Sequence, residues 1–223
     1  MKIGVIGGTG GMGKGFALRW CPKHDILIGS RDSQRASDAA KEYLELAVAH
    51  YDDICGTIAG YDNARVAQES DVLILSIPYE NIDSVCSRVL PLTKDGCVVV
   101  SPIVPMVKTD AGFEFIPMIR EEDPSHKMVA RHARDSSRVV SAFHVISEKK
   151  LAKPGLRLDS DIFVCGDDRE AVAVIEGLIC EIDGLRPIRL GPGSLAYMVE
   201  IATPLLLNAM IRNKIRNPGI KIV

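Results

Sequence analysis

The start of the chain places a glycine-rich segment between two apolar segments of different periodicity. Residues 3–6 form a short apolar run that predicts a buried strand, and residues 15–20 predict a helix with one apolar side. Between them, Gly8-Thr9-Gly10-Gly11-Met12-Gly13 has the spacing G-x-G-x-x-G. Strand, glycine turn and helix are the context in which this spacing indicates a dinucleotide site, the alternative being a glycine turn without a ligand.

Each glycine of this motif has a separate expected role. We expect Gly8 to permit the tight turn, Gly10 to let the backbone approach a pyrophosphate, and Gly13 to let helix and strand pack closely. The free N–H groups at the start of the helix then face the phosphates, and the helix dipole favours the negative charge.

The tip of the second expected strand, which covers residues 25–29, indicates which dinucleotide is bound. An NAD site places an acid about 20 residues past the glycines, but here the tip is Ser30-Arg31. Arg31 and Arg35 share one side of a helix that starts near Asp32. A hydroxyl and two guanidinium groups suit a 2′-phosphate, so we predict NADP. The alternative is that both arginines are solvated and Asp32 binds the ribose, although Asp32 is better suited to cap the helix.

Strands and helices alternate along the first half of the chain, which predicts parallel β-α-β units. The clearest strand, residues 71–77, has no polar alternation, as expected for a parallel strand covered on both faces. We therefore predict an α/β fold, a Rossmann-type doubly wound parallel sheet with a smaller C-terminal α/β part. Ligands bind outside the carboxyl ends of such strands, and residues 77–79 and 101–105 lie there.

Three further segments carry structural expectations. Residues 33–48 predict a helix with Leu44 and Leu46 on its inner side, and residues 108–124 are expected to be irregular. Residues 194–212 predict a strongly apolar helix kinked at Pro204. The stretch 201–211 fits either a subunit contact in a homodimer or a buried core helix.

Bulk properties narrow the class of protein. A net charge of −2 over 223 residues argues against a nucleic-acid-binding surface. Because the first strand begins at residue 2, we expect no signal peptide, and we find no apolar run long enough to span a bilayer. The six cysteines include no C-x-x-C pair and are expected to be reduced. We expect a cytoplasmic protein that binds neither membrane nor nucleic acid.

Several catalytic motifs are absent. None of the five tyrosines begins a Tyr-x-x-x-Lys motif, no nucleophile elbow occurs, and no His or Cys spacing indicates a metal site. His144 stands at the end of an expected strand, where it either orients a ligand carbonyl or has only a structural role. A nucleotide domain without an acid–base set indicates hydride transfer between two cofactors, because such transfer needs mainly positioning.

These motifs together resemble the coenzyme F420-dependent NADP oxidoreductases, nearly from end to end. The resemblance begins with the glycine turn and continues through later and more specific motifs: Ile28-Gly29-Ser30-Arg31, Ile77-Pro78, Ser101-Pro102-Ile103-Val104-Pro105, Val140-Ser141-Ala142-Phe143-His144, Cys165-Gly166-Asp167-Asp168, residues 181–187 and residues 203–208.

The resemblance implies a division of roles along the chain. Residues 1–145 would form the NADP-binding Rossmann domain, and residues 146–223 a smaller domain that closes the deazaflavin cleft. The residues implied to bind NADP form three groups: Thr9, Gly10, Gly11 and Met12 at the pyrophosphate and ribose, Ser30, Arg31 and Arg35 at the 2′-phosphate, and Ile77, Asn81 and Val104 beside the nicotinamide.

The implied activity is reversible hydride transfer between NADP(H) and coenzyme F420. Relatives with the same nucleotide domain leave two alternatives open. One is an NADPH-dependent flavin or ferric reductase, and the other is a module that senses NADPH without turnover.

Overall fold

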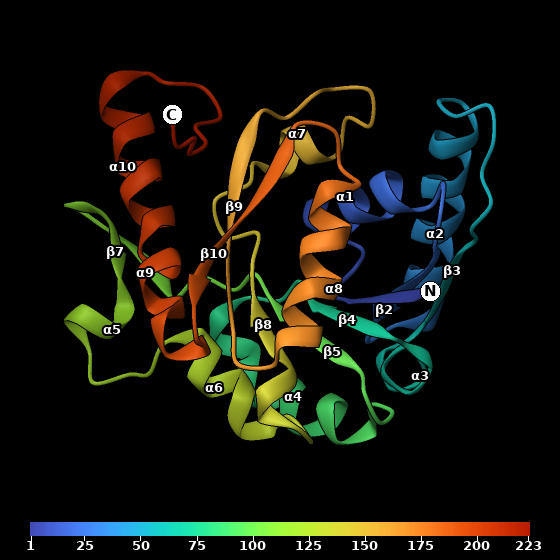
Figure 1. Ribbon diagram of the computed structural model, residues 1–223, viewed down its shortest axis with the longest axis horizontal. Coiled ribbons are helices and arrows are strands. Elements are labelled where there is room, and N and C mark those ends of the chain that lie inside the picture. Colours follow the sequence, from blue (N-terminus) through green and yellow to red (C-terminus); the bar gives the residue numbers. More distant parts are fainter.

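A computed structural model describes residues 1–223 as one eight-stranded sheet with helices on both faces (Figure 1). Six strands are parallel and lie in the order β3-β2-β1-β4-β5-β8. Their bounds are Lys2–Ile6 for β1, Asp25–Ser30 for β2, Ile58–Asp62 for β3, Val72–Leu75 for β4, Val98–Ser101 for β5 and Val139–Ser141 for β8. This order is that of a Rossmann sheet, so the predicted fold class is confirmed.

The core lies in two layers, one on each face of the sheet. One layer holds the inner sides of α1 (Gly11–Trp20), α2 (Ser33–Val48) and α8 (Arg169–Cys180). The other holds those of α3 (Asn63–Glu69), α4 (Ile82–Val89) and α6 (Ser125–His132). Strand β4 is completely buried because both faces are covered, which explains its unbroken apolar sequence.

The sheet continues beyond β8 with two more strands. Strand β9 (Ser160–Gly166) runs antiparallel to β8, and β10 (Leu185–Gly191) runs parallel to β9. The ring of Trp20 packs against Phe16 and Phe143, and its indole N–H donates to the carbonyl of Leu178 at 2.9 Å. Helix α1 is thereby joined to the end of β8 and to α8.

Residues 108–124 are more regular than the sequence predicted. Strands β6 (Met106–Thr109) and β7 (Gly112–Phe115) pair as an antiparallel hairpin, and the short helix α5 (Ile116–Ile119) follows. Gly112 has φ +128°, which a side chain rarely permits. The expectation of irregular backbone is therefore wrong, because a two-residue turn before a glycine closes the hairpin.

The inner side of α2 also differs from the prediction. Its buried residues are Ala36, Ala40, Tyr43 and Ala47, whereas Leu44 and Leu46 are exposed. The alanines let the helix lie close to the sheet, and the backbone of Ala36 leaves no room for a side chain at Gly60 of β3. The two leucines lie on the side of the helix away from that contact.

The long C-terminal apolar segment is interrupted near Pro204, where the sequence predicted a kink. Three short 3₁₀ segments lie elsewhere, at Tyr79–Asn81, Leu90–Leu92 and Ser136–Arg138, and a fourth at Gly193–Leu195 leads into α9 (Ala196–Glu200). Helix α10 (Ala202–Asn213) starts after Ile201, because Pro204 has no N–H to donate to the carbonyl of Glu200.

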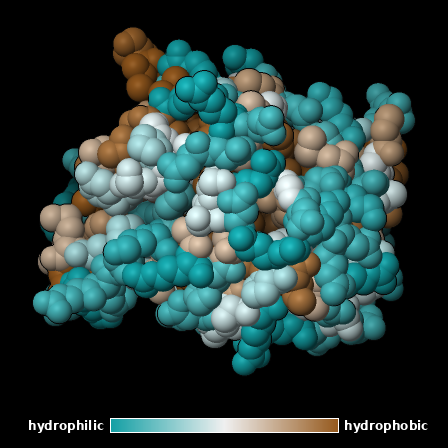
Figure 2. Space-filling view, turned by 60° about the horizontal axis from the view of Figure 1, so that its bottom comes forward, coloured by the Kyte–Doolittle hydropathy of each residue, from teal (hydrophilic) through white to brown (hydrophobic).

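The same segment corrects an expectation about membranes. An 18-residue window within Gly193–Asn213 has a mean hydropathy of 1.5, which is long enough and apolar enough to cross a membrane by length and composition. By that criterion, the expectation that the chain has no such run is wrong. The molecular face in Figure 2 is mostly hydrophilic, and its apolar side chains gather in small areas, most clearly at the upper left.

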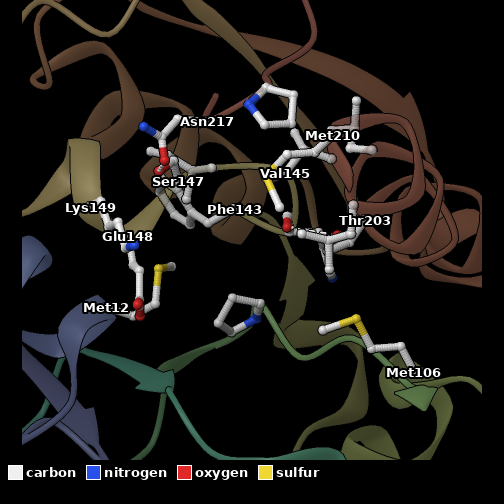
Figure 3. Close-up of a pocket in the computed structure, with 16 residues that line it drawn as sticks. Met12, Met106, Phe143, Val145, Ser147, Glu148, Lys149, Thr203, Met210 and Asn217 are labelled. Atoms are coloured by element: carbon white, nitrogen blue, oxygen red, sulfur yellow. Dashed lines mark hydrogen bonds between the residues drawn. The ribbon is translucent and has the colours of Figure 1, made fainter. Parts of the chain in front are cut away.

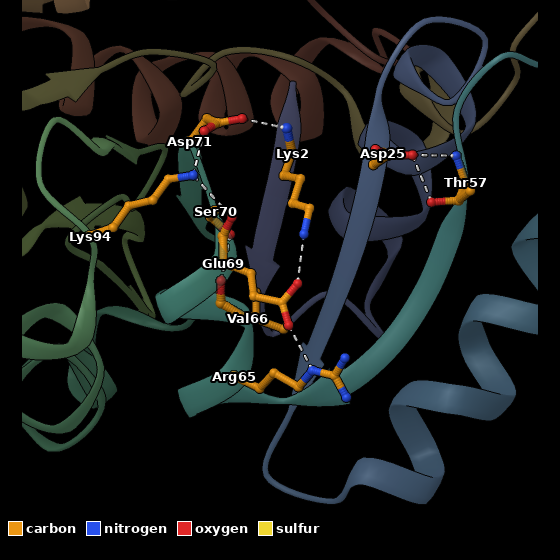
Figure 4. Close-up of polar contacts among 9 residues, drawn as sticks. All are labelled: Lys2, Asp25, Thr57, Arg65, Val66, Glu69, Ser70, Asp71 and Lys94. Atoms are coloured by element: carbon orange, nitrogen blue, oxygen red, sulfur yellow. Dashed lines mark hydrogen bonds and ion pairs between the residues drawn. The ribbon is translucent and has the colours of Figure 1, made fainter.

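Charged side chains hold together the amino ends of the strands (Figure 4). The backbone N–H of Lys2 donates to Asp71 at 2.7 Å, and its ammonium group donates to Glu69 at 2.8 Å. Hydrogen bonds from Lys2 and Arg65 lower the pKa of Glu69 to about 2. These charged side chains stabilise the amino edge of the sheet, which lies opposite the glycine turn.

Candidate functional site

The glycine turn lies at the carboxyl end of β1. Gly7 has φ +72°, and a Cβ there would lie 2.3 Å from the carbonyl oxygen of Ser76. The conformational role that we expected of Gly8 thus belongs to Gly7. A Cβ at Gly13 would lie 2.2 Å from the carbonyl oxygen of Gly8, which agrees with its predicted role in close packing.

Gly10 is different, because only the carbonyl oxygen of Gly7, at 3.7 Å, would lie near a Cβ there. A side chain at Gly10 would therefore point into open space next to the first turn of α1. No side chain caps this helix and no acid lies in its first turn. Its first N–H groups are free to donate to a phosphate, so this cradle fits a pyrophosphate.

Two side chains support the turn, and the sequence did not indicate the first of them. The hydroxyl of Tyr43 donates to the carbonyl of Gly8 at 3.3 Å, and burial raises the pKa of Tyr43 to about 12. The tyrosine therefore remains a donor at neutral pH. The methyl group of Ile77 packs beside Gly7 from the end of β4. Tyr43 lies 35 residues from Gly8, and no local pattern predicts such a pair.

The tip of β2 carries the residues predicted to bind a 2′-phosphate. Asp32 accepts hydrogen bonds from the N–H groups of Gln34 and Arg35 at 2.9 and 3.3 Å, so it caps α2 as expected. Arg31 and Arg35 are exposed and take part in no ion pair. The hydroxyl of Ser30 accepts the N–H of Asp32 at 3.2 Å. Two free guanidinium groups and a hydroxyl therefore lie at one strand end.

The residues expected beside a nicotinamide ring lie past the two neighbouring strands. Ile77 follows β4 and Val104 follows β5, and both are half-buried. Asn81 is exposed at the end of the 3₁₀ segment after Ile77. The three positions therefore lie along the carboxyl edge that also holds the glycine turn.

A cavity of about 470 Å³ opens beside this edge (Figure 3). Met12 of α1, Pro102 after β5 and Met106 of β6 form one wall. The opposite wall comes from Thr203, Leu206, Leu207 and Met210 of α10. The volume suits a small organic ligand, and the mostly apolar lining suits a flat ring system. The pocket shares Met12 with the first turn of α1.

Asn208 joins two walls of this pocket. Its side-chain oxygen accepts the N–H of Phe113 at 2.8 Å, and its amide nitrogen donates to the carbonyl of Phe113 at 2.6 Å. The side chain thus pairs with β7 as a neighbouring strand would. The hairpin that carries Met106 is thereby fixed against the helix that carries Met210.

Glu200, the last residue of α9, fixes the segment that leads into α10. It is fully buried, and its carboxylate accepts the N–H groups of Ser125 and His126, each at 3.0 Å, and the hydroxyl of Ser125 at 2.7 Å. Burial raises the pKa of Glu200. This carboxylate caps α6, so α9 and α6 keep a defined separation.

His144 lines the cavity but is nearly fully buried, and neither ring nitrogen has a hydrogen-bond partner. Burial lowers the pKa of His144 to about 3, so the ring is neutral at pH 7. Its carbonyl accepts the hydroxyl of Thr203 at 2.8 Å. No three His, Cys, Asp or Glu side chains gather closely enough to hold a metal ion.

Known proteins resemble this chain over its full length. Residues 2–105 match the family described as NADP oxidoreductase, coenzyme F420-dependent. The chain is 37% identical over its whole length to the F420-dependent NADP reductase of Methanocaldococcus jannaschii, with 98% of that protein covered. It is 36% identical to the F420-dependent NADP reductase of Methanothermobacter thermautotrophicus, with 94% covered.

A solved structure has the same architecture. It comes from Arthrobacter sp. FB24 and is proposed to be an F420-dependent NADP-reductase. The two chains align over 100% of this one and 99% of the other with a TM-score of 0.80. At 20% identity, the likeness concerns the fold.

Proposed function

This chain belongs to the coenzyme F420-dependent NADP oxidoreductases, and on that premise we propose that its glycine turn holds NADP(H) and its apolar pocket holds F420. The enzyme transfers a hydride between these two cofactors. The observation that carries the assignment of the sites is their adjacency. Met12 belongs both to the first turn of α1 and to the lining of the pocket.

The proposed nucleotide contacts follow the carboxyl edge of the sheet. The pyrophosphate takes the N–H groups near Gly10 and Gly11, with Gly8, Thr9 and Gly13 shaping the turn. The 2′-phosphate takes Ser30, Arg31 and Arg35. The nicotinamide lies toward Ile77, Asn81 and Val104, which brings it beside the pocket.

NADPH supplies a hydride from its nicotinamide ring, and the deazaflavin ring of F420 accepts it. The residues of the chain position the two rings and exclude water. Apolar side chains such as Met106 and Leu206 cover the pocket, while Thr203 and the neutral ring of His144 orient polar ring atoms. In this assignment His144 transfers neither hydride nor proton.

We also propose which part of the chain binds which cofactor. Residues 1–145 hold NADP, and residues 146–223 supply α10, which closes the deazaflavin side of the pocket. We also propose a cytoplasmic location. Glu200 and Asn208 lie within the apolar run and hydrogen-bond to α6 and β7, and such polar groups are costly inside a bilayer.

The exposed side of α10 supports a homodimer. Leu205 and Ile211 are exposed there, and Met118 of α5 is exposed as well. Contiguous apolar patches that remain in water are typical of subunit contacts. Sedimentation velocity is expected to give a dimer for the wild type and a monomer for Leu205→Lys. A wild-type monomer at micromolar concentration contradicts this proposal.

Gly10→Val tests the nucleotide site. The backbone at Gly10 is extended and nothing crowds its Cβ position, so the variant is expected to fold. The branched side chain then fills the cradle, and NADPH binding is expected to disappear. Circular dichroism checks the fold, and fluorescence titration measures binding. A folded variant that still binds NADPH places the pyrophosphate elsewhere.

A further inference from the structure

Helix α7 (Glu148–Leu151) is held firmly against the outer side of α1. Arg19 is nearly buried, and its guanidinium group donates to five carbonyl groups at the end of α7 and in the loop after it: Lys150, Leu151, Lys153, Pro154 and Leu156. Leu151 is fully buried, and a Cβ at Gly15 would lie 2.7 Å from its side chain. The position of α7 relative to the glycine turn is therefore fixed.

This anchoring holds the carboxylate of Glu148 next to Gly11 of the glycine turn. Its Oε2 lies 2.7 Å from the position that a Cβ on Gly11 would take. Figure 3 shows the side chain reaching from α7 toward Met12 at the edge of the pocket. Glu148 forms no ion pair and no side-chain hydrogen bond, while the nearby Lys14 is paired with Glu42 at 2.7 Å. An unpaired negative charge thus lies at the positive end of α1.

We propose that Glu148 sets the affinity for NADP(H) as an unpaired anion held beside the phosphate cradle. This inference rests on the proposed placement of the pyrophosphate at the glycine turn. A carboxylate beside the first turn of α1 repels a pyrophosphate that binds there, because both groups are anions. The side chain of Glu148 is exposed, so solvent reduces this repulsion without removing it. The repulsion weakens binding of the nucleotide and speeds its release.

Glu148→Gln removes the charge and keeps the shape of the side chain. We expect the dissociation constants of NADPH and NADP⁺ to fall by the same factor, roughly three- to tenfold, because both carry the pyrophosphate. High salt is expected to shrink the difference between variant and wild type. Glu45→Gln is the matched control, since Glu45 is an exposed glutamate of α2 without an ion pair. This control changes the net charge equally and is expected to leave binding unchanged.

The experiment separates this inference from the site assignment. If Glu148→Gln binds NADPH as the wild type does, or more weakly, while Gly10→Val does not bind, the site stands and the role of Glu148 is refuted. Weaker binding would mean that the carboxylate contacts the bound nucleotide favourably. If Glu45→Gln tightens binding as much as Glu148→Gln, the effect comes from net charge and the inference fails. If Gly10→Val still binds NADPH, both the site assignment and the inference about Glu148 are wrong.

Discussion

In the proposed site, individual side chains at the tip of β2 decide between NADP and NAD. Arg31 is exposed and unpaired, so its guanidinium group is available to a 2′-phosphate. Arg31→Ala removes a charge-assisted hydrogen bond that contributes about 1.5–3 kcal/mol. We expect the dissociation constant of NADPH to rise about tenfold or more and that of NADH to stay nearly unchanged. Fluorescence titration with both nucleotides measures the effect.

Arg88→Ala provides the comparison for Arg31→Ala. Arg88 is also exposed and without an ion pair, but it lies on α4, away from the tip of β2. Its loss changes the net charge equally and should leave the binding of NADPH unaltered. Equal losses of NADPH and NADH affinity in Arg31→Ala would exclude the 2′-phosphate as its partner.

For single residues, the sequence correctly predicts structural roles that depend only on neighbours in the chain. The cap formed by Asp32 and the close packing at Gly13 follow from local geometry, and both were predicted correctly. The positive φ belongs to Gly7 rather than Gly8, because the turn begins one residue earlier than the motif suggests. Contacts such as Tyr43 with Gly8 depend on the tertiary fold and leave no local pattern.

Among the elements, the pocket depends on the pairing of α10 with the hairpin β6–β7. Asn208→Leu leaves the partly buried N–H and carbonyl of Phe113 without partners, which costs at most about 1–3 kcal/mol per unsatisfied group. The hairpin then loosens on the F420 side only. We expect the KM for F420 to rise about tenfold while the KM for NADPH stays within about twofold. Steady-state kinetics with each substrate varied in turn checks this split.

Asn213→Leu is the control for this prediction. Asn213 lies on the same helix, but its amide donates only to the carbonyl of Ala209 in that helix, at 3.0 Å. Its loss should change neither KM. If the KM for NADPH rises in Asn208→Leu as much as that for F420, the hairpin does not belong to the F420 side of the site.

The sequence predicts elements best where one periodicity dominates. The parallel pairing of the strands follows from alternating strands and helices, and β4 follows from its unbroken apolar run. The hairpin β6–β7 was missed because its two short strands pack against a helix from the far end of the chain. Leu44 and Leu46 were misassigned because the buried face of α2 consists of three alanines and Tyr43, which leaves the two leucines exposed.

For the whole molecule, the stability of the fold depends on a histidine that cannot be charged where it lies. Burial lowers the pKa of His144 to about 3, whereas an unfolded chain binds the proton near the ordinary value of 6.5. The folded state is therefore favoured above pH 6.5, and this contribution is lost as the pH falls from 6.5 toward 3. The slope is about 1.4 kcal/mol per pH unit for one such group. Burial also lowers the pKa of His126 and raises the pKa of Glu200. The stability curve of the wild type alone therefore does not isolate the contribution of His144.

His144→Leu isolates this contribution, because leucine fills a similar volume without titrating and leaves His126 and Glu200 in place. The difference in unfolding free energy between the variant and the wild type is expected to shift in favour of the variant by about 2 kcal/mol between pH 7.5 and pH 5.0. Urea unfolding followed by circular dichroism at the two pH values measures it. Turnover of the variant at pH 7.5 should fall only modestly, because the neutral ring orients and does not transfer a proton. Parallel stability curves would mean that His144 takes up its proton in the folded enzyme near the ordinary pKa of 6.5, and the burial effect described here would then be refuted.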